Sequence, residues 1–504
     1  MKHTTALAVV ALLAFAGTSP AQEDAFLRNE KRLTELERQL NLLRQENAAL
    51  KRRIEILSLP TSEAVEAHLQ VRGISGVSTT DEAGRNLSEA LERVRLSGSF
   101  SARYDFSENR TDLSSASEDT GDHVYTRIEL GIHYDLNDNI TLGTRLRGSF
   151  IGGGIAGLNA PGDPASAADS DTLEIYEAYA LFRDVNMFGR LGGHVPVSIQ
   201  VGRQELLYGD GFILGNDSFG RGISYDGIRF IQESGRHRTD LFWAKLVEND
   251  FVTASGAITP TAAPDDDADI AGIHFNYRPV DDTSLAAYAL YLKSWGNSAS
   301  IPFGPYEEAS VLTLGARLSG SAMQTLSYAV EAAAQTGKYG GEDVKGAYGV
   351  KGAFRYESIG NPQRPYLAFT AVYAAGDNAP ADGEFNRFVP LAQDKHGLLG
   401  ALDLFYASNL KAAGGELGMR PLPELVLSGS YFQYYAVEPA DNAGGWLPGG
   451  GSGNYIGAEW NVGIGWEISP RSRLALMYGQ FHPGDFPVAA DTARRLYLAI
   501  DVSF

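Results

Sequence analysis

The sequence ends in the stretch RRLYLAIDVSF, residues 494–504, in which every second side chain from Leu496 onward is apolar. Successive side chains of an extended strand point to opposite faces, so an alternating stretch has one apolar face and one mixed face. Residues 494–504 are therefore predicted to form a strand with one apolar face and one mixed face. Its apolar face is formed by Leu496, Leu498, Ile500, Val502 and Phe504.

The same alternation recurs from Val94 to the end of the chain, in about eighteen runs of roughly ten residues. Short connectors such as 137–139 alternate with long polar ones such as 152–171. This pattern predicts an all-β fold, a transmembrane antiparallel β-barrel of about 18 strands over residues 94–504. A soluble sandwich or propeller is the alternative, but a propeller needs a repeat of about 40–50 residues that the sequence lacks.

The chain end also resembles the signal that outer-membrane barrels present to their assembly machinery. The alternating last strand and the aromatic carboxyl terminus at Phe504 carry this resemblance. We therefore expect outer-membrane lipid and the assembly machinery as partners, the latter through Phe504.

The N-terminal segment differs in character from the rest of the chain. Residues 1–21 have a basic start, a short apolar run and small residues before Gln22, which predicts a secretory signal peptide. Residues 22–59 carry leucines at alternating steps of three and four around Asn47, which predicts a short periplasmic coiled-coil helix, and possible assembly into a homo-oligomer. An amphipathic helix docked on its own domain is the alternative. Residues 60–93 are interpreted as a linker.

Composition excludes several classes of function. The net charge is −20, from 42 Lys and Arg against 62 Asp and Glu, which argues against nucleic acid as a partner because phosphate binding needs a basic field. The chain has no cysteine, which excludes disulfides, thiol catalysis and thiolate zinc sites. No local motif joins the histidines and acids for catalysis, so we expect no enzyme, no cofactor and no metal site.

If the apolar faces meet lipid, the polar faces line the lumen. Parity within each run places more basic than acidic residues inside, and the acids concentrate in the long connections. Such a lumen would favour anions, although barrels also pair internal charges only to satisfy them. The basic residues expected to line the pore are Arg95, Arg103, Arg127, Arg145, Arg147, Arg229, Lys293, Arg317, Lys351, Arg355 and Arg495, and the acids are Asp105, Glu129, Asp135, Glu331, Glu459 and Asp501.

Two segments resemble the alginate export porin family. The first is GRQELLYGDG at 202–211, with YDGIR at 225–229, and the second runs from FVPL at 388–391 through KHG at 395–397 to the aromatic strand at 431–436. Phe219 departs from the pattern, because the family more often has Trp there. The residues that match the family motif are Gly202, Arg203, Gln204, Tyr208, Gly209, Asp210, Asp226 and Gly227.

The resemblance implies an eighteen-stranded outer-membrane barrel whose arginine-rich lumen passes an anionic polysaccharide, with loops that gate both ends. It adds Arg203 to the pore-lining set, provided that a bulge turns this residue inward. We therefore expect an outer-membrane channel for an anionic polysaccharide or oligosaccharide such as a polyuronate. The alternatives are a general or small-anion diffusion porin, which could be trimeric, and an outer-membrane tether that acts through the coiled coil.

Overall fold

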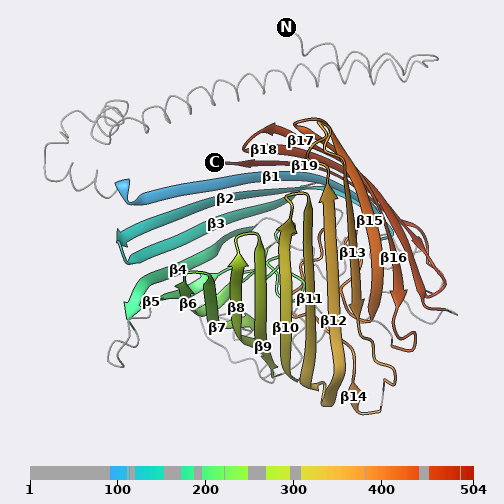
Figure 1. Ribbon diagram of the computed structural model, residues 1–504, viewed down its shortest axis with the longest axis horizontal. Coiled ribbons are helices and arrows are strands. Elements are labelled where there is room, and N and C mark those ends of the chain that lie inside the picture. The colour runs from blue at the N-terminus through green and yellow to red at the C-terminus, as the bar shows by residue number, and fades with distance from the viewer. Residues whose placement is uncertain are drawn as a thin grey trace, which may run out of the picture. The chain divides into compact units, whose positions relative to one another are not determined.

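The computed structural model describes residues 91–110, 113, 120–152, 172–186, 196–220, 222–247, 268–295, 308–380, 382–441, 453–487 and 490–504. Eighteen of the strands within these residues close into one antiparallel barrel, in which β1 pairs with both β2 and β19 (Figure 1). The predicted barrel is thus confirmed. The remaining strand, β14, is two residues long and runs parallel to the start of β12.

The strands are β1 (Val94–Glu108), β2 (Gly121–Asn137), β3 (Ile140–Gly152), β4 (Thr172–Asn186), β5 (Pro196–Gln204), β6 (Tyr225–Ser234), β7 (His237–Val247), β8 (Ala268–Val280), β9 (Thr283–Ser294), β10 (Ala309–Ala322), β11 (Leu326–Tyr339), β12 (Glu342–Glu357), β13 (Tyr366–Ala374), β14 (Glu384–Phe385), β15 (Leu410–Leu422), β16 (Leu425–Ala436), β17 (Tyr455–Ser469), β18 (Ser472–Pro483) and β19 (Ala493–Ser503).

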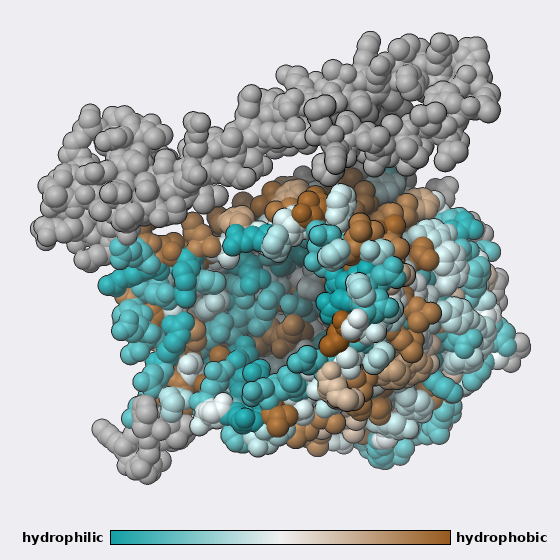
Figure 2. All heavy atoms as spheres, turned by 45° about the horizontal axis from the view of Figure 1, so that its top comes forward, coloured by the Kyte–Doolittle hydropathy of each residue, from teal (hydrophilic) through white to brown (hydrophobic). Residues whose placement is uncertain are grey.

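The barrel wall is apolar outside and polar inside. In β19, Leu498 and Val502 are exposed on the outer face, whereas Arg495 and Tyr497 are buried on the inner face. Figure 2 shows hydrophobic residues on the outer surface and a hollow whose visible wall is mostly hydrophilic. The alternation in the sequence therefore corresponds to an inside and an outside.

The two ends of the barrel differ in their connections. Tight turns such as 138–139, 235–236 and 470–471 join strands at one end, which we call the turn end. Long connections such as 205–224 join strands at the other end, the loop end, where the two-residue turn 340–341 is an exception. In outer-membrane barrels the short turns face the periplasm and the longer loops face the exterior.

Two of the long connections fold into the barrel. We call residues 205–224 the first inward loop and residues 375–409 the second inward loop. The main buried apolar cluster lies between these loops and the inner wall, and includes Phe212, Phe388 and Phe405. The core of this protein is therefore inside the barrel, where it narrows the lumen.

The chain divides into two units, Met1–Arg93 and Val94–Phe504. The predicted signal peptide, coiled coil and nearly all of the linker lie outside the described residues. Among the residues that the structure describes, no helix is long and apolar enough to span a membrane.

The last residue extends the seam between β1 and β19 that closes the ring. The Phe504 amide donates to the Gly98 carbonyl at 3.0 Å, and the Gly98 amide donates to the Phe504 carbonyl at 3.2 Å. The Phe504 ring lies over Gly98, since a Cβ placed at position 98 would be 2.2 Å from the ring Cζ atom. A side chain at position 98 would therefore displace the terminal ring.

We predict that Gly98→Ala destabilises the folded barrel by about 1 kcal/mol, because overpacked contacts typically cost about 1–3 kcal/mol and this ring can partly move. The measurement is the temperature at which the barrel loses its compact mobility on a gel in detergent. Gly352→Ala on the outer face of β12 is the matched control, because a Cβ there has no heavy atom within 4 Å. Equal unfolding temperatures for the two variants would contradict the prediction.

Candidate functional site

The first inward loop begins where the family-motif stretch leaves the wall. The Gln204 amide nitrogen donates to the carbonyls of Gly202 and Gly227 at 3.3 and 3.4 Å, which ties the end of β5 to β6. Tyr208 then stacks on Phe242 of β7 and on His274 of β8, with ring centroids 5.5 and 4.5 Å apart. The loop therefore runs along the inner wall instead of extending into solvent.

The loop continues along the inner wall to β10 and β12, which it contacts through Asp210. Its carboxylate accepts a hydrogen bond from Lys351 of β12 at 2.5 Å and lies 3.7 Å from Arg317 of β10. Burial raises the pKa of the Asp210 carboxyl, but Lys351 and Arg317 outweigh burial and hold it below its usual value. Gly209 allows this approach, because it has a φ of +66° and a Cβ there would lie 3.0 Å from Arg317 Cδ.

The tip of the first inward loop pairs with the second. The Ala392 amide donates to the Ile213 carbonyl at 2.8 Å, and the Asp394 amide donates to the Gly211 carbonyl at 2.9 Å. Phe212 and Phe388 stack beside this pairing, 6.1 Å apart. The two loops thus form one ribbon across the lumen.

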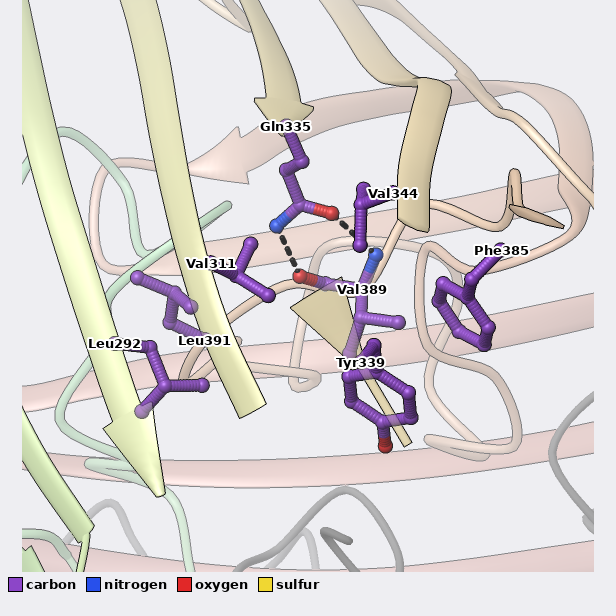
Figure 3. A pocket seen from close by; sticks show the side chains of 8 residues that line it. All are labelled: Leu292, Val311, Gln335, Tyr339, Val344, Phe385, Val389 and Leu391. Carbon is purple, nitrogen blue, oxygen red and sulfur yellow. Dashed lines mark hydrogen bonds between the residues drawn. The ribbon is translucent and has the colours of Figure 1, made fainter. Parts of the chain in front are cut away.

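A side-chain amide anchors the second loop to the wall. Gln335 of β11 donates to the Val389 carbonyl at 2.6 Å and accepts from the Val389 amide at 2.9 Å (Figure 3). An apolar pocket beside this contact is lined by Leu292, Val311, Tyr339, Val344, Phe385 and Leu391, among others. The Gln335 side chain therefore pairs with the Val389 amide and carbonyl as a neighbouring strand would. These backbone groups would otherwise be buried without hydrogen-bond partners.

Phe219 and His396 hold the two loops together on the side of β1. Their rings stack with centroids 3.4 Å apart and an interplanar angle of 6°. The Arg103 guanidinium covers Phe219 at 4.0 Å from the ring centroid and donates to the Phe219 carbonyl at 2.9 Å. Phe219 is therefore in contact with the wall and with the second loop.

The buried carboxylate of Asp403 links His396 to the wall. Asp403 of the second loop accepts from Arg495 of β19 at 2.6 Å and lies 3.0 Å from His396 Nδ1. Burial raises the pKa of the Asp403 carboxyl, but His396 and Arg495 outweigh burial and hold it well below its usual range. Asp403 is consequently ionised at neutral pH and neutralises an arginine that would otherwise be buried without its full set of partners.

The first inward loop returns to the wall along β1–β4. Arg127 donates to the Ser218 and Gly220 carbonyls at 2.9 and 3.2 Å. The side chain of Arg147 is only 3% exposed and pairs with Glu129 at 2.6 Å. Arg145, by contrast, is 32% exposed and pairs with Glu177 at 2.8 Å and Glu205 at 3.4 Å. Arg145 is thus the accessible arginine of this group.

The expected pore-lining residues share one property: each lies within 4.0 Å of a carboxylate. Charge pairing, which the sequence left open, thus applies to the whole set. On the inner wall the pairs are Arg95 with Asp135, Arg103 with Asp105, Arg127 with Glu129, Arg145 with Glu177 and Glu205, Arg147 with Glu129, Arg229 with Asp240, Arg317 with Glu331 and Asp210, Lys351 with Asp210, Arg355 with Glu357, and Arg495 with Asp105 and Asp403.

Two expected positions are corrected by strand register. Arg203 pairs with Asp226, and its β5 face also carries Val201, so it lies on the outer face of the wall. The expected bulge is absent, because the pairing of β5 with β6 runs without a register shift. Lys293 also points outward, since its neighbours Leu292 and Ser294 are buried inside.

Sequence reasoning missed the contacts between the loops. Phe219 was noted only as a departure from the family pattern, and Gln335 and Asp403 were not identified as site residues. A glycine-rich stretch around an aromatic residue was the available signal for Phe219. The described residues contain no group of three or more His, Cys, Asp or Glu that could hold a metal ion.

Comparisons with known proteins agree with this architecture. The sequence model of a family described as "Alginate export" matches residues 93–500. The fold is similar to that of Pseudomonas aeruginosa OccK11 (OpdR), at 14% identity and a TM-score of 0.52, over 82% of this chain and 97% of the other. It is also similar to that of Acinetobacter baumannii OccAB2, at 13% identity and a TM-score of 0.52, over 81% and 98%. Among curated protein sequences, none matches the chain.

We predict that Phe219→Ala loosens the contact between the two loops and increases the mean conductance and current noise of the channel. Loss of a packed aromatic side chain costs about 3–5 kcal/mol in a core and less at a partly exposed position. Planar-bilayer recordings measure the effect. Phe219→Trp keeps an aromatic ring and should behave as the unmodified protein, as should Leu207→Ala, which removes an exposed side chain of the same loop. Unchanged recordings for Phe219→Ala would contradict the role of the stack.

Proposed function

The chain belongs to the alginate export family, and on that premise we propose that it passes an anionic polysaccharide or oligosaccharide, such as a polyuronate, through its lumen. Family membership makes it an outer-membrane channel protein and not an enzyme. The proposal of an anionic polysaccharide substrate rests on the series of arginine–carboxylate pairs along the inner wall of the narrowed lumen.

Paired arginines suit a polyanion that must keep moving. A uronate carboxylate offers the same planar pair of oxygen acceptors as Asp or Glu, so it can exchange with the wall carboxylate at one arginine. Each exchange replaces one charge-assisted hydrogen bond by another of similar strength. The polymer then meets many weak sites in sequence, as transit through a channel requires.

Arg145 is the best-placed residue for such an exchange. Its side chain is partly exposed, and it already contacts two carboxylates, one from β4 and one from the first inward loop. Arg147, its neighbour on the same face, is enclosed by Glu129 and the Tyr176 ring, the latter at 3.2 Å. We propose that Arg145 contacts the substrate and that Arg147 holds the end of the first inward loop that returns to the wall.

The pairing also favours a second candidate, a general or small-anion diffusion porin. Neutralised arginines attract anions less strongly than free ones, so a weakly selective channel is compatible with the same wall. A tether that acts through the N-terminal helix stays a prediction, since that segment lies outside the described residues.

We predict that Arg145→Glu weakens block of the channel current by added polyuronate by about tenfold, because a charge-assisted hydrogen bond contributes about 1.5 kcal/mol or more. The same variant should shift the reversal potential in a salt gradient toward cation preference. Planar-bilayer recordings with and without the polymer measure both effects.

Arg203→Glu is the matched control, because Arg203 is paired to one carboxylate on the outer face and should leave block unchanged. If the polymer never blocks the unmodified channel, the polysaccharide proposal fails and the small-anion porin is favoured. If both variants lose block equally, Arg145 has no special role.

A further inference from the structure

One lysine on the outer face has no carboxylate partner within the described part of the chain. Lys411 of β15 points outward, because its neighbours Leu410 and Ala412 are buried inside. It lies at the loop end, as the second residue of its strand. Other outward basic side chains near this end are paired: Arg203 with Asp226, Lys245 with Asp269, Lys293 with Glu308, and Arg494 with Glu108, at 2.6, 3.5, 3.3 and 2.8 Å.

Tyrosines surround Lys411. Strand register places it directly between Tyr373 of β13 and Tyr435 of β16, and its ammonium lies 5.7 Å from the Tyr435 ring centroid. Tyr435 contacts Tyr455, and Tyr373 stacks on Tyr348, with centroids 5.1 and 5.3 Å apart. An unpaired cation is therefore framed by aromatic rings and phenol groups at the boundary of the apolar band.

The outer surface of β15 next to Lys411, toward the turn end, carries small residues, and we call the surface over Ala413 and Gly415 the groove. The next two outward residues of the strand are Ala413 and Gly415, which have little or no side chain. Phe369 of β13 and Tyr431 of β16 flank Gly415 in register. Strands β13, β15 and β16 lie side by side, as Figure 1 shows. Larger side chains thus flank the groove on both sides at Gly415, whereas Ala413 lies between Ala371 of β13 and Gln433 of β16, and Lys411 stands at the loop end of the groove.

We propose that Lys411 and this groove bind a phosphorylated glycolipid of the outer leaflet. The phosphate would pair with the Lys411 ammonium and accept hydrogen bonds from the adjacent phenols. The sugar would pack on the tyrosine rings, which occupy the headgroup level in membrane proteins. An acyl chain would occupy the groove over Ala413 and Gly415. Charge complementarity selects this occupant, because a neutral lipid would leave Lys411 without a counter-charge.

The test uses the full chain in detergent, titrated with bis-phosphorylated lipid A and followed by native mass spectrometry. The unmodified protein should bind this lipid about tenfold more tightly than the same lipid with both phosphates removed. Lys411→Ala should lose that preference, and Lys411→Arg should retain it. Ala413→Leu, which fills the groove, should weaken binding of both lipids.

Lys245→Ala is the matched control, because it removes an outward lysine that is already paired with Asp269. It should bind as the unmodified protein does. Compact gel mobility before heating establishes that each variant is folded. The proposal is overturned if Lys411→Ala keeps the phosphate preference, if Lys245→Ala loses it to the same extent, or if the unmodified protein has none.

Discussion

The structure depends on the requirement that every backbone amide and carbonyl within a bilayer has a partner. A sheet satisfies this only when its first and last strands meet, and here β1 pairs with β19 over residues 99–108 and 494–503. The terminal Phe504 extends the seam by pairing with Gly98 outside the regular strands. Because the wall is then complete, the lumen can hold loops whose own polar groups find partners among the inner side chains.

The backbone amides and carbonyls of the inward loops also need partners inside the barrel. Their carbonyls and amides are taken up by wall side chains, such as Arg103, Arg127 and Gln335, or by the other loop. Arg103, Arg127 and Arg495 therefore each have two kinds of partner, a carboxylate and a loop carbonyl. This is why they can be buried: a charge in a low-dielectric site is tolerable only when it is paired and hydrogen-bonded.

The sequence allowed the fold to be predicted because alternation has a physical cause, namely lipid on one side and water or protein on the other. Parity also placed most of the inner arginines. It failed at Lys293, where the expected face depended on where a run was taken to begin. Arg203 was assigned to the lumen by the family resemblance, and the bulge that this assignment required is absent. The contact of Phe219 with His396 was not predictable, because it joins two loops distant in sequence and neither loop has a period that specifies its path.

Pairing of the inner arginines with carboxylates changes how the charge of the lumen relates to function. A count of inner arginines suggested a positive channel, yet each arginine of the expected pore-lining set has a carboxylate within reach, several supplied by the loops, such as Glu205, Asp210 and Asp403. A lumen of this kind does not hold anions by net charge. Under the proposed function, substrate carboxylates would replace the partners of these arginines, and the partly exposed pair of Arg145 with Glu205 would exchange more easily than the buried pair of Arg495 with Asp105. Selectivity would then follow from which pairs are accessible, and the inward loops determine that accessibility.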